Sequence, residues 1–97
     1  SYTYERSICQ NERETITCYG RRKIKIILAY YGRKKAFKCG FGLDTNCEAK
    51  GSEAKIKEAC DGKNTCKLHA SNDVFGNPCP TWSSKYIQVK YQCAGLK

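Results

Sequence analysis

Eight cysteines supply the most reactive side chains of this 97-residue sequence, at positions 9, 18, 39, 47, 60, 66, 79 and 93. Thiols can bind zinc, attack a substrate or pair as disulfides. Structural zinc sites usually take ligands from close pairs such as C-x2-C, whereas the tightest spacing here, Cys60 to Cys66, leaves five residues between. An even number of cysteines in a short chain indicates disulfides and an oxidising compartment, although the sequence alone permits about a hundred pairings.

Few residues of this sequence are candidates for a catalytic role. A serine triad would need the single histidine, His69, which falls in an expected strand beside Leu68 and is better explained as a structural residue. A nucleophilic cysteine needs a free thiol, and full pairing leaves none. The nine acidic residues are scattered, without the clustered spacing of a calcium site. The sequence therefore predicts a protein that is not an enzyme, needs no cofactor and holds no metal.

The formal net charge is +9, from 18 Lys and Arg against 9 Asp and Glu. In a nuclear or cytosolic protein this charge would first suggest nucleic acid. Disulfides place the expected partners outside the cell instead: sulfated or sialylated glycans, bacterial surface polymers or acidic membranes. A simpler reading of equal weight is that the Lys and Arg side chains only solvate the surface.

The two ends of the chain and its apolar runs bear on localisation. The chain starts at Ser1 and contains no Met, as expected of a processed, secreted protein. No apolar run approaches the ~18 residues of a membrane span. We therefore expect a secreted, extracellular protein with no membrane span and no nucleic-acid partner.

Alternating patterns predict the strands that would position these groups. Strands are expected over residues 15–18, 21–29, 65–70 and 85–93. In the second of them Ile24 and Ile26 share one face, while Lys23 and Lys25 share the other, so this strand should be half-buried with a cationic outer face. Residues 71–84 are rich in Asn, Gly and Pro and are expected to form a long loop.

One clear helix is expected at about 52–60. Ser52 can cap it, and Ile56, Ala59 and Cys60 form a stripe that can face the core. The Asp61-Gly62 pair should end it. These elements predict an α+β fold, a small disulfide-rich domain with antiparallel β-strands, one helix and long structured loops.

Four segments, in this order along the chain, match the pattern of a known family. They are Tyr31-Gly32-Arg33 after a strand, Asp44-Thr45-Asn46-Cys47, residues 71–80 (SNDVFGNPCP) and residues 85–93 (KYIQVKYQC). With eight cysteines at fitting spacings, the sequence resembles the rhamnose-binding lectins, or sea urchin egg lectin-like family, over nearly its whole length. The resemblance implies a single carbohydrate-recognition domain spanning residues 1–97. It also implies four disulfides: Cys9–Cys39, Cys18–Cys93, Cys47–Cys79 and Cys60–Cys66.

The resemblance further implies a sugar site. In the family a sugar is held by a Glu just after the first cysteine, the Tyr of YGR, an Asn, the Asp of DPC and a Lys at the start of the last strand. These roles fall on Gln10, Tyr31, Asn72, Asn77 and Lys85, with Gly32, Arg33 and Pro78 in supporting positions. Such polar groups can meet pairs of hydroxyls, and an aromatic ring can meet the apolar face of a sugar.

Two of these positions depart from the family pattern, because Gln10 and Asn77 replace the expected Glu and Asp. An amide can still meet two hydroxyls, but a hydrogen bond without charge assistance falls from roughly 1.5–3 to about 0.5–1.5 kcal/mol. Three outcomes stay open. The site binds L-rhamnose or D-galactose more weakly, it has moved to another glycan such as a galactoside, or the positive charge of Arg33, Lys34, Lys35 and Lys85 now serves anionic polymers.

Each site residue also has a purely structural interpretation. Tyr31 could be mainly a packing residue, and Gly32 could supply a backbone shape that the turn requires. Arg33 could pair with Asp44 or Asp73 and hold the fold. Pro78 would stiffen its loop, and Trp82 could stack on a sugar or be partly buried in the core.

The sequence thus predicts a secreted lectin that binds L-rhamnose and/or D-galactose-type glycans without metal and agglutinates cells or microbes. The family suggests a role in innate immunity. Single sugar sites are weak, so agglutination needs several linked sites and we expect a homo-oligomer. The alternative is a cationic host-defence or polyanion-binding protein on the same fold, whose partners include anionic glycans and bacterial polysaccharides.

Overall fold

The computed structural model describes residues 2–35, 38–40, 42, 46–79 and 83–95. Its elements, in chain order, are β1 (Thr3–Cys9), β2 (Arg13–Thr17), β3 (Lys23–Arg33), β4 (Cys47–Glu48), α1 (Ser52–Cys60), β5 (Thr65–His69), α2 (Asn72–Phe75) and β6 (Tyr86–Ala94). This arrangement confirms the predicted α+β class. In the described part of the chain no helix is long and apolar enough to cross a bilayer.

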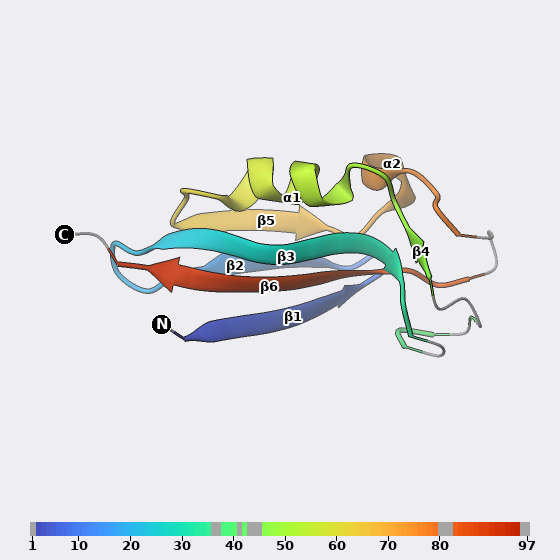
Figure 1. The fold of residues 1–97 in the computed structure, drawn as a ribbon, viewed down its shortest axis with the longest axis horizontal. Helices are drawn as coiled ribbons and strands as arrows, with labels where there is room; N and C mark the ends of the chain where they lie inside the picture. Colours follow the sequence, from blue (N-terminus) through green and yellow to red (C-terminus); the bar gives the residue numbers. More distant parts are fainter. Residues whose placement is uncertain (1, 36–37, 41, 43–45, 80–82, 96–97) are drawn as a thin grey trace.

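The strands form two antiparallel sheets. One has four strands in the order β1-β6-β3-β4, and the other pairs β2 with β5. Figure 1 shows the four-stranded sheet in front of the pair, with α1 lying along one side of both. The molecule is elongated, with extents of 46 × 22 × 19 Å. Both termini and the β2–β3 turn lie at one end, and α2 and β4 lie at the other (Figure 1).

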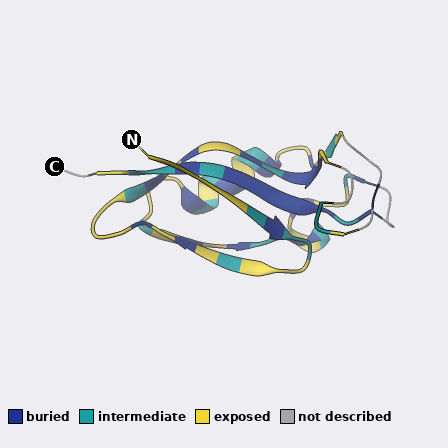
Figure 2. Ribbon diagram, turned by 90° about the horizontal axis from the view of Figure 1, so that it is seen from below, coloured by how far each residue is buried: buried dark blue, intermediate teal, exposed yellow. Residues whose placement is uncertain are grey.

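The core lies between the two sheets and is closed by α1. Ile8, Ile87 and Tyr31 stand opposite one another across β1, β6 and β3 and are fully buried. Ile16 of β2 and Ile56 of α1 belong to the same core cluster, and both are also fully buried. β6 is buried at most of its positions, whereas β1 is exposed over its first half (Figure 2). Strand β6, which lies inside the four-stranded sheet, is therefore the most buried part of that sheet's pairing with β1.

Residues at the two ends of helix α1 form hydrogen bonds with backbone groups on the edge of β3 that does not pair with β6. At its C-terminal end, the Asp61 carboxylate accepts the Ile26 N–H at 2.7 Å, and the Gly62 N–H donates to the Ile24 carbonyl at 2.9 Å. At its N-terminal end, Ser52 Oγ accepts the Tyr31 N–H at 3.1 Å. The prediction that Ser52 caps the helix is therefore wrong. Gly51, at φ 79°, occupies the cap, and the Ser52 hydroxyl serves the neighbouring strand.

All four expected disulfides are present: Cys9–Cys39, Cys18–Cys93, Cys47–Cys79 and Cys60–Cys66. Cys18–Cys93 joins the end of β2 to β6 across a separation of 75 residues. Cys47–Cys79 joins β4 to the segment after α2. Four disulfides in a chain of 97 residues are expected of a small domain with a limited core.

Several element boundaries differ from the sequence-based expectation. β3 runs on to Arg33, so Tyr31-Gly32-Arg33 lies within the strand and not after it. Strand β1, the two-residue β4 and the four-residue α2 were not expected. β1 offers only Ile8 as a buried apolar residue, and β4 exists because it pairs with residues 32–33. α2 depends on its cap, since the Ser71 hydroxyl accepts the Asp73 N–H at 3.0 Å.

Candidate functional site

Tyr31 stands at the centre of the candidate site. Its ring is fully buried and stacks on Phe75 of α2, with ring centroids 5.0 Å apart. Its hydroxyl donates to Asn72 Oδ1 at 2.8 Å. Burial raises the pKa of Tyr31 to about 12, which keeps the phenol neutral and a hydrogen-bond donor. Tyr31 is thus a packing residue whose polar tip reaches a second predicted sugar ligand.

Asn72 is presented by the first turn of α2. The oxygen of its amide accepts the Tyr31 hydroxyl, and its nitrogen has no partner among the described residues. Asn72 is half-buried. An amide held by its oxygen presents its two N–H donors in a fixed direction, which suits a pair of sugar hydroxyls.

Gln10 and Lys85 form a second pair. The Lys85 N–H donates to Gln10 Oε1 at 3.0 Å, and the Gln10 N–H donates to the Lys85 carbonyl at 2.8 Å. Gln10 lies in a tight turn in which Asn11 adopts φ 72°, a conformation that Asn tolerates better than most residues. Lys85 is fully buried, and its ammonium donates to the Ser83 carbonyl at 2.8 Å. The pair fixes the start of β6 against the end of β1.

Backbone hydrogen bonds connect the segment of the Gln10–Lys85 pair to the segment of Asn72. The Asn11 N–H donates to the Ala70 carbonyl at 2.6 Å, and the Ala70 N–H donates to the Glu12 carbonyl at 3.0 Å. The turn that carries Gln10 is therefore bonded both to Lys85 and to the segment that leads into Asn72. Four of the five predicted sugar ligands lie on four neighbouring segments at one end of the molecule: the β1–β2 turn, β3, α2 and the start of β6.

Among the described residues, no hydrogen bond joins Asn77 to the other four. It is exposed and follows Gly76, which ends α2 at φ 91°. Pro78 is half-buried and precedes Cys79, whose disulfide to Cys47 anchors the segment to β4. Asp44, Pro80 and Trp82, which belong to the predicted surroundings of the site, lie outside the described residues.

Arg33 has a different partner from those considered in the sequence. It is fully buried and donates to four backbone carbonyls. Nε donates to Ser84 at 2.6 Å, Nη1 to Lys35 at 2.7 Å, and Nη2 to Lys38 and Gly40 at 2.7 and 3.3 Å. No described carboxylate takes part, so the expected pairing with Asp73 is wrong. The planar guanidinium has five N–H donors and can bind several carbonyls of a looping backbone at once, which a pairing with one carboxylate would not allow.

Gly32 is required by close approach and not by an unusual backbone angle. A Cβ at this position would lie 2.1 Å from the carbonyl oxygen of Cys47 on β4. Any side chain would push β4 away from β3 and disturb the segment that carries the Cys47–Cys79 disulfide. The expectation that a turn requires an unusual backbone shape at Gly32 is therefore wrong, because Gly32 lies within β3 and is constrained by its steric contact with β4.

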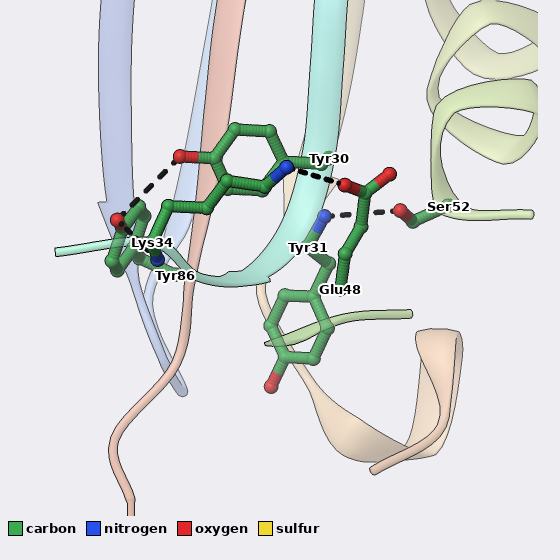
Figure 3. Close-up of polar contacts among 6 residues, drawn as sticks. All are labelled: Tyr30, Tyr31, Lys34, Glu48, Ser52 and Tyr86. Atoms are coloured by element: carbon green, nitrogen blue, oxygen red, sulfur yellow. Dashed lines mark hydrogen bonds and ion pairs between the residues drawn. The ribbon is translucent and has the colours of Figure 1, made fainter. Parts of the chain in front are cut away.

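On the outer face of the sheet, tyrosines and lysines hold the end of β3 (Figure 3). The Tyr30 hydroxyl donates to the Tyr86 hydroxyl oxygen at 3.5 Å, and the Lys34 N–H donates to the same oxygen at 3.0 Å. The Lys34 ammonium pairs with Glu48 at 2.8 Å and lies 4.9 Å from the Tyr30 ring centroid. Figure 3 also shows Tyr31 directed away from this network.

These contacts move the pKa of two tyrosines in opposite directions. Burial, followed by the hydrogen bond to Tyr86, raises the pKa of Tyr30. Burial alone would raise the pKa of Tyr86, but the bonds it accepts from Tyr30 and Lys34 and the charge of Lys38 outweigh burial and lower it. Lys38 lies 5.0 Å from the Tyr86 ring centroid. Lys34 and Lys38 are thus engaged with the protein itself, which leaves fewer free cations near the site than the sequence suggests.

Two groups of functional interest were not singled out from the sequence. The fourfold carbonyl binding of Arg33 leaves no local signal, because its acceptors are backbone atoms. The second group, exposed tyrosines at the other end of the molecule, does leave a signal in the sequence. Tyr2 precedes β1 and Tyr4 lies in it, two residues further on, and Tyr19 stands in a turn beside Arg21 and Arg22. Aromatic and cationic residues together in an exposed segment are a mark of binding surfaces.

The fold and its four bridges define a small, disulfide-stabilised α+β domain. The chain matches the family described as "D-galactoside/L-rhamnose binding SUEL lectin domain" over residues 16–93. The chain therefore belongs to this family.

Named relatives agree with this assignment. The D-galactoside-specific lectin of Heliocidaris crassispina is 36% identical over 94 residues, covering 92% of this chain and 89% of that lectin. The L-rhamnose-binding lectin ELEL-1 of Echinometra lucunter is 36% identical over 91 residues, covering 90% and 87%. The rhamnose-binding lectin of Silurus asotus is 36% identical over 97 residues, covering 94% of this chain but only 31% of that longer protein. The domain thus occurs both as most of a lectin and as part of a longer one.

Proposed function

We propose that this chain is a secreted lectin domain that binds L-rhamnose or D-galactose-type glycans without metal. Gln10, Tyr31, Asn72, Asn77 and Lys85 would form the sugar site, supported by Gly32, Arg33 and Pro78. The domain would span residues 1–97 as a single unit and would catalyse no reaction. The names of its relatives support the class of ligand.

The hydrogen bond from Tyr31 to Asn72 is the observation that best supports the location. It places a donor amide in a fixed orientation beside a buried aromatic ring, at the end of the molecule where Gln10 and Lys85 are also bonded. Neutral sugars are recognised by such fixed planar polar groups, because a preorganised group loses little entropy on binding.

Gln10 can replace a glutamate here without loss of structure. Its oxygen accepts the Lys85 N–H, as one oxygen of a carboxylate would. The remaining atom is then an N–H₂ donor in place of a charged acceptor. The site would therefore keep its shape and lose two charge-assisted acceptors, one here and one at Asn77. Weaker binding of the same sugars is expected.

Restoring the acids tests this proposal. Asn77→Asp should strengthen binding of L-rhamnose or D-galactose by about tenfold, the difference between a neutral and a charge-assisted hydrogen bond. Asn46→Asp is the matched control, because it makes the same change at another exposed asparagine. Calorimetric titration with a chelator present would measure both. Equal effects of the two substitutions, or none, would count against Asn77 as a ligand.

A polyanion-binding role is the second candidate, and the net charge of +9 favours it. Binding through Lys and Arg weakens steeply as salt rises, because counterions are released, whereas binding of a neutral sugar changes little. A glycan array run at low and high salt, with rhamnosides, galactosides and sulfated and sialylated glycans, separates the two roles. Signal restricted to acidic glycans and erased by salt would favour the second.

We further propose that the lectin works as a homo-oligomer and agglutinates cells or microbes. A single sugar site has only micromolar to millimolar affinity, or about −8 to −4 kcal/mol, so cross-linking needs several sites in one assembly. Sedimentation at micromolar concentration should show a dimer or larger species. A monomer would contradict this part of the proposal.

A further inference from the structure

A groove of about 420 Å³ lies at the end of the molecule opposite the candidate sugar site. It is lined by Tyr4, Glu5, Arg6, Thr17, Tyr19, Arg22, Tyr91 and Cys93. A second hollow of about 310 Å³ shares Tyr4, Arg22 and Cys93 with it and adds Tyr2 and Gly95. The two hollows are therefore neighbours, with Tyr4 and Arg22 lining both. Figure 1 places the β2–β3 turn, which carries Tyr19 and Arg22, at the end where both termini lie.

Tyrosine rings cover much of this surface. Tyr4 stacks on Tyr91 with centroids 5.3 Å apart, and Tyr2 meets Tyr4 edge-on at 5.1 Å. Tyr2 is 75% exposed and Tyr19 is 91% exposed. Exposed aromatic side chains that gather beside a hollow are a common feature of binding surfaces. Flat rings with a polar tip suit the apolar faces and hydroxyls of sugar rings.

The groove is built on a rigid frame. Cys93, which lines both hollows, is bonded to Cys18 at the end of β2. Asn64 Nδ2 lies 2.9 Å from the carbonyl oxygens of Cys18, Gly20 and Arg22 and so holds the turn that presents Tyr19 and Arg22. A surface loop held by an internal amide and a disulfide has already lost its freedom before a ligand arrives, which favours binding.

Arg22 gives the groove its charge preference. Arg6 is paired with Glu14 at 2.8 Å. Glu5 keeps its negative charge, but its carboxylate accepts from Gln88 Nε2 on the face of the sheet opposite Tyr4 and Arg6, because neighbouring residues of a strand point to opposite faces. Arg22 is exposed and has no ion-pair partner among the described residues. A planar guanidinium beside aromatic rings binds sulfate or carboxylate groups well, because it can donate two parallel hydrogen bonds.

We propose that this groove is a second glycan site, specific for acidic oligosaccharides, and that it works independently of the neutral-sugar site. Tyr2, Tyr4 and Tyr19 would stack on the sugar rings, and Arg22 would hold a sulfate or carboxylate. The two sites lie at opposite ends of a 46 Å molecule, so one domain can contact two glycans at once. A domain with two different sites can bridge an acidic coat and a neutral glycan without forming an oligomer.

Paired arginine variants test the assignment. Arg22→Gln should weaken binding of a heparin-derived tetrasaccharide about tenfold, whereas Arg21→Gln, the same loss of charge one residue away and outside the groove, should change it little. Tyr19→Ala should weaken binding by a similar factor through lost stacking. None of the three variants should alter binding of L-rhamnose or D-galactose, so failure of this site and failure of the neutral-sugar site are distinguishable.

Two further measurements complete the test. A hyaluronan tetrasaccharide, which carries carboxylates and no sulfate, shows which anion Arg22 prefers, and binding of either oligosaccharide supports the site. The bound tetrasaccharide should also protect Tyr2 and Tyr19 from nitration, as read by mass spectrometry. Equal weakening by Arg21→Gln and Arg22→Gln, unprotected tyrosines, or no binding of either oligosaccharide would overturn the proposal, because charge spread over the surface would then explain the attraction.

Discussion

Tyr31 joins packing and recognition in one side chain. Its ring belongs to the core and its hydroxyl orients Asn72. Tyr31→Phe removes only the hydroxyl, so we expect a loss of stability of about 1 kcal/mol and a loss of neutral-sugar affinity of about tenfold. Urea unfolding and calorimetric titration measure the two effects. Tyr19→Phe, at a tyrosine far from this site, is the control and should change neither.

Alkaline pH should reveal the buried phenol. Burial raises the pKa of Tyr31 from its ordinary value near 10 to about 12, so the folded state favours the neutral form. This contribution to stability is complete below about pH 10 and is lost as the pH rises to about 12, where the folded protein also loses the proton. Tyr31→Phe cannot ionise and should lose less stability than the wild type over this range. Parallel losses in urea unfolding would contradict the assignment.

Gly32 is a position where one methyl group should matter. Its Cβ would lie 2.1 Å from the Cys47 carbonyl, so Gly32→Ala must displace β4. We expect a loss of about 1–3 kcal/mol, in the range of other overpacked sites. Gly95→Ala is the control, because nothing lies within 4 Å of the Cβ built there. Chemical unfolding would compare the free energies of unfolding of the two variants. Equal values would show that β4 can move away from β3 at no cost.

The candidate site could be predicted from the sequence only in part, and only through the family resemblance. Local patterns could not show that Gln10 would meet Lys85, because 75 residues separate them. The replacement of two acids by amides is visible in the sequence, but the role of each remaining atom depends on the hydrogen bonds around it. The acceptors of Arg33 were mispredicted because charge suggests a carboxylate, whereas the structure supplies carbonyls.

At the scale of elements, regular patterns were predictable and short elements were not. Helix α1 has the expected bounds, Ser52–Cys60, and the alternation of Ile24 and Ile26 correctly indicates one buried face of β3. Helix α2 and strand β4 are held by a cap and by tertiary pairing, so their sequences carry little signal of their own. These two elements border the candidate site, which explains why its shape was harder to foresee than the core.

The disulfides should differ in what they contribute. Cys18–Cys93 spans 75 residues and Cys60–Cys66 spans 6. In the chain-entropy account, removing the long bridge by a double alanine substitution should cost about 4 kcal/mol, and removing the short one about 2 kcal/mol. Non-reducing urea unfolding of the two double variants would rank them. A larger loss from the short bridge would show that local packing, and not loop closure, governs their contributions.

The whole molecule has two distinct ends. The candidate sugar site lies at the end formed by α2 and the ends of β1 and β3, and the tyrosine–arginine groove lies where the termini meet (Figure 1). The net charge of +9 belongs to the whole surface and attracts acidic partners at a distance. Long-range attraction is screened by salt, whereas hydrogen bonds to a neutral sugar are not. Salt therefore separates the contribution of the molecule's overall charge from that of its sugar site.

Titration of L-rhamnose and D-galactose into the wild-type protein, at low and high salt with a chelator present, tests the central claim most directly. We predict weak binding of at least one of the two sugars, with an affinity that neither salt nor the chelator changes. The absence of binding to both sugars, with acidic oligosaccharides still bound at low salt, would contradict a neutral-sugar site at Tyr31 and Asn72.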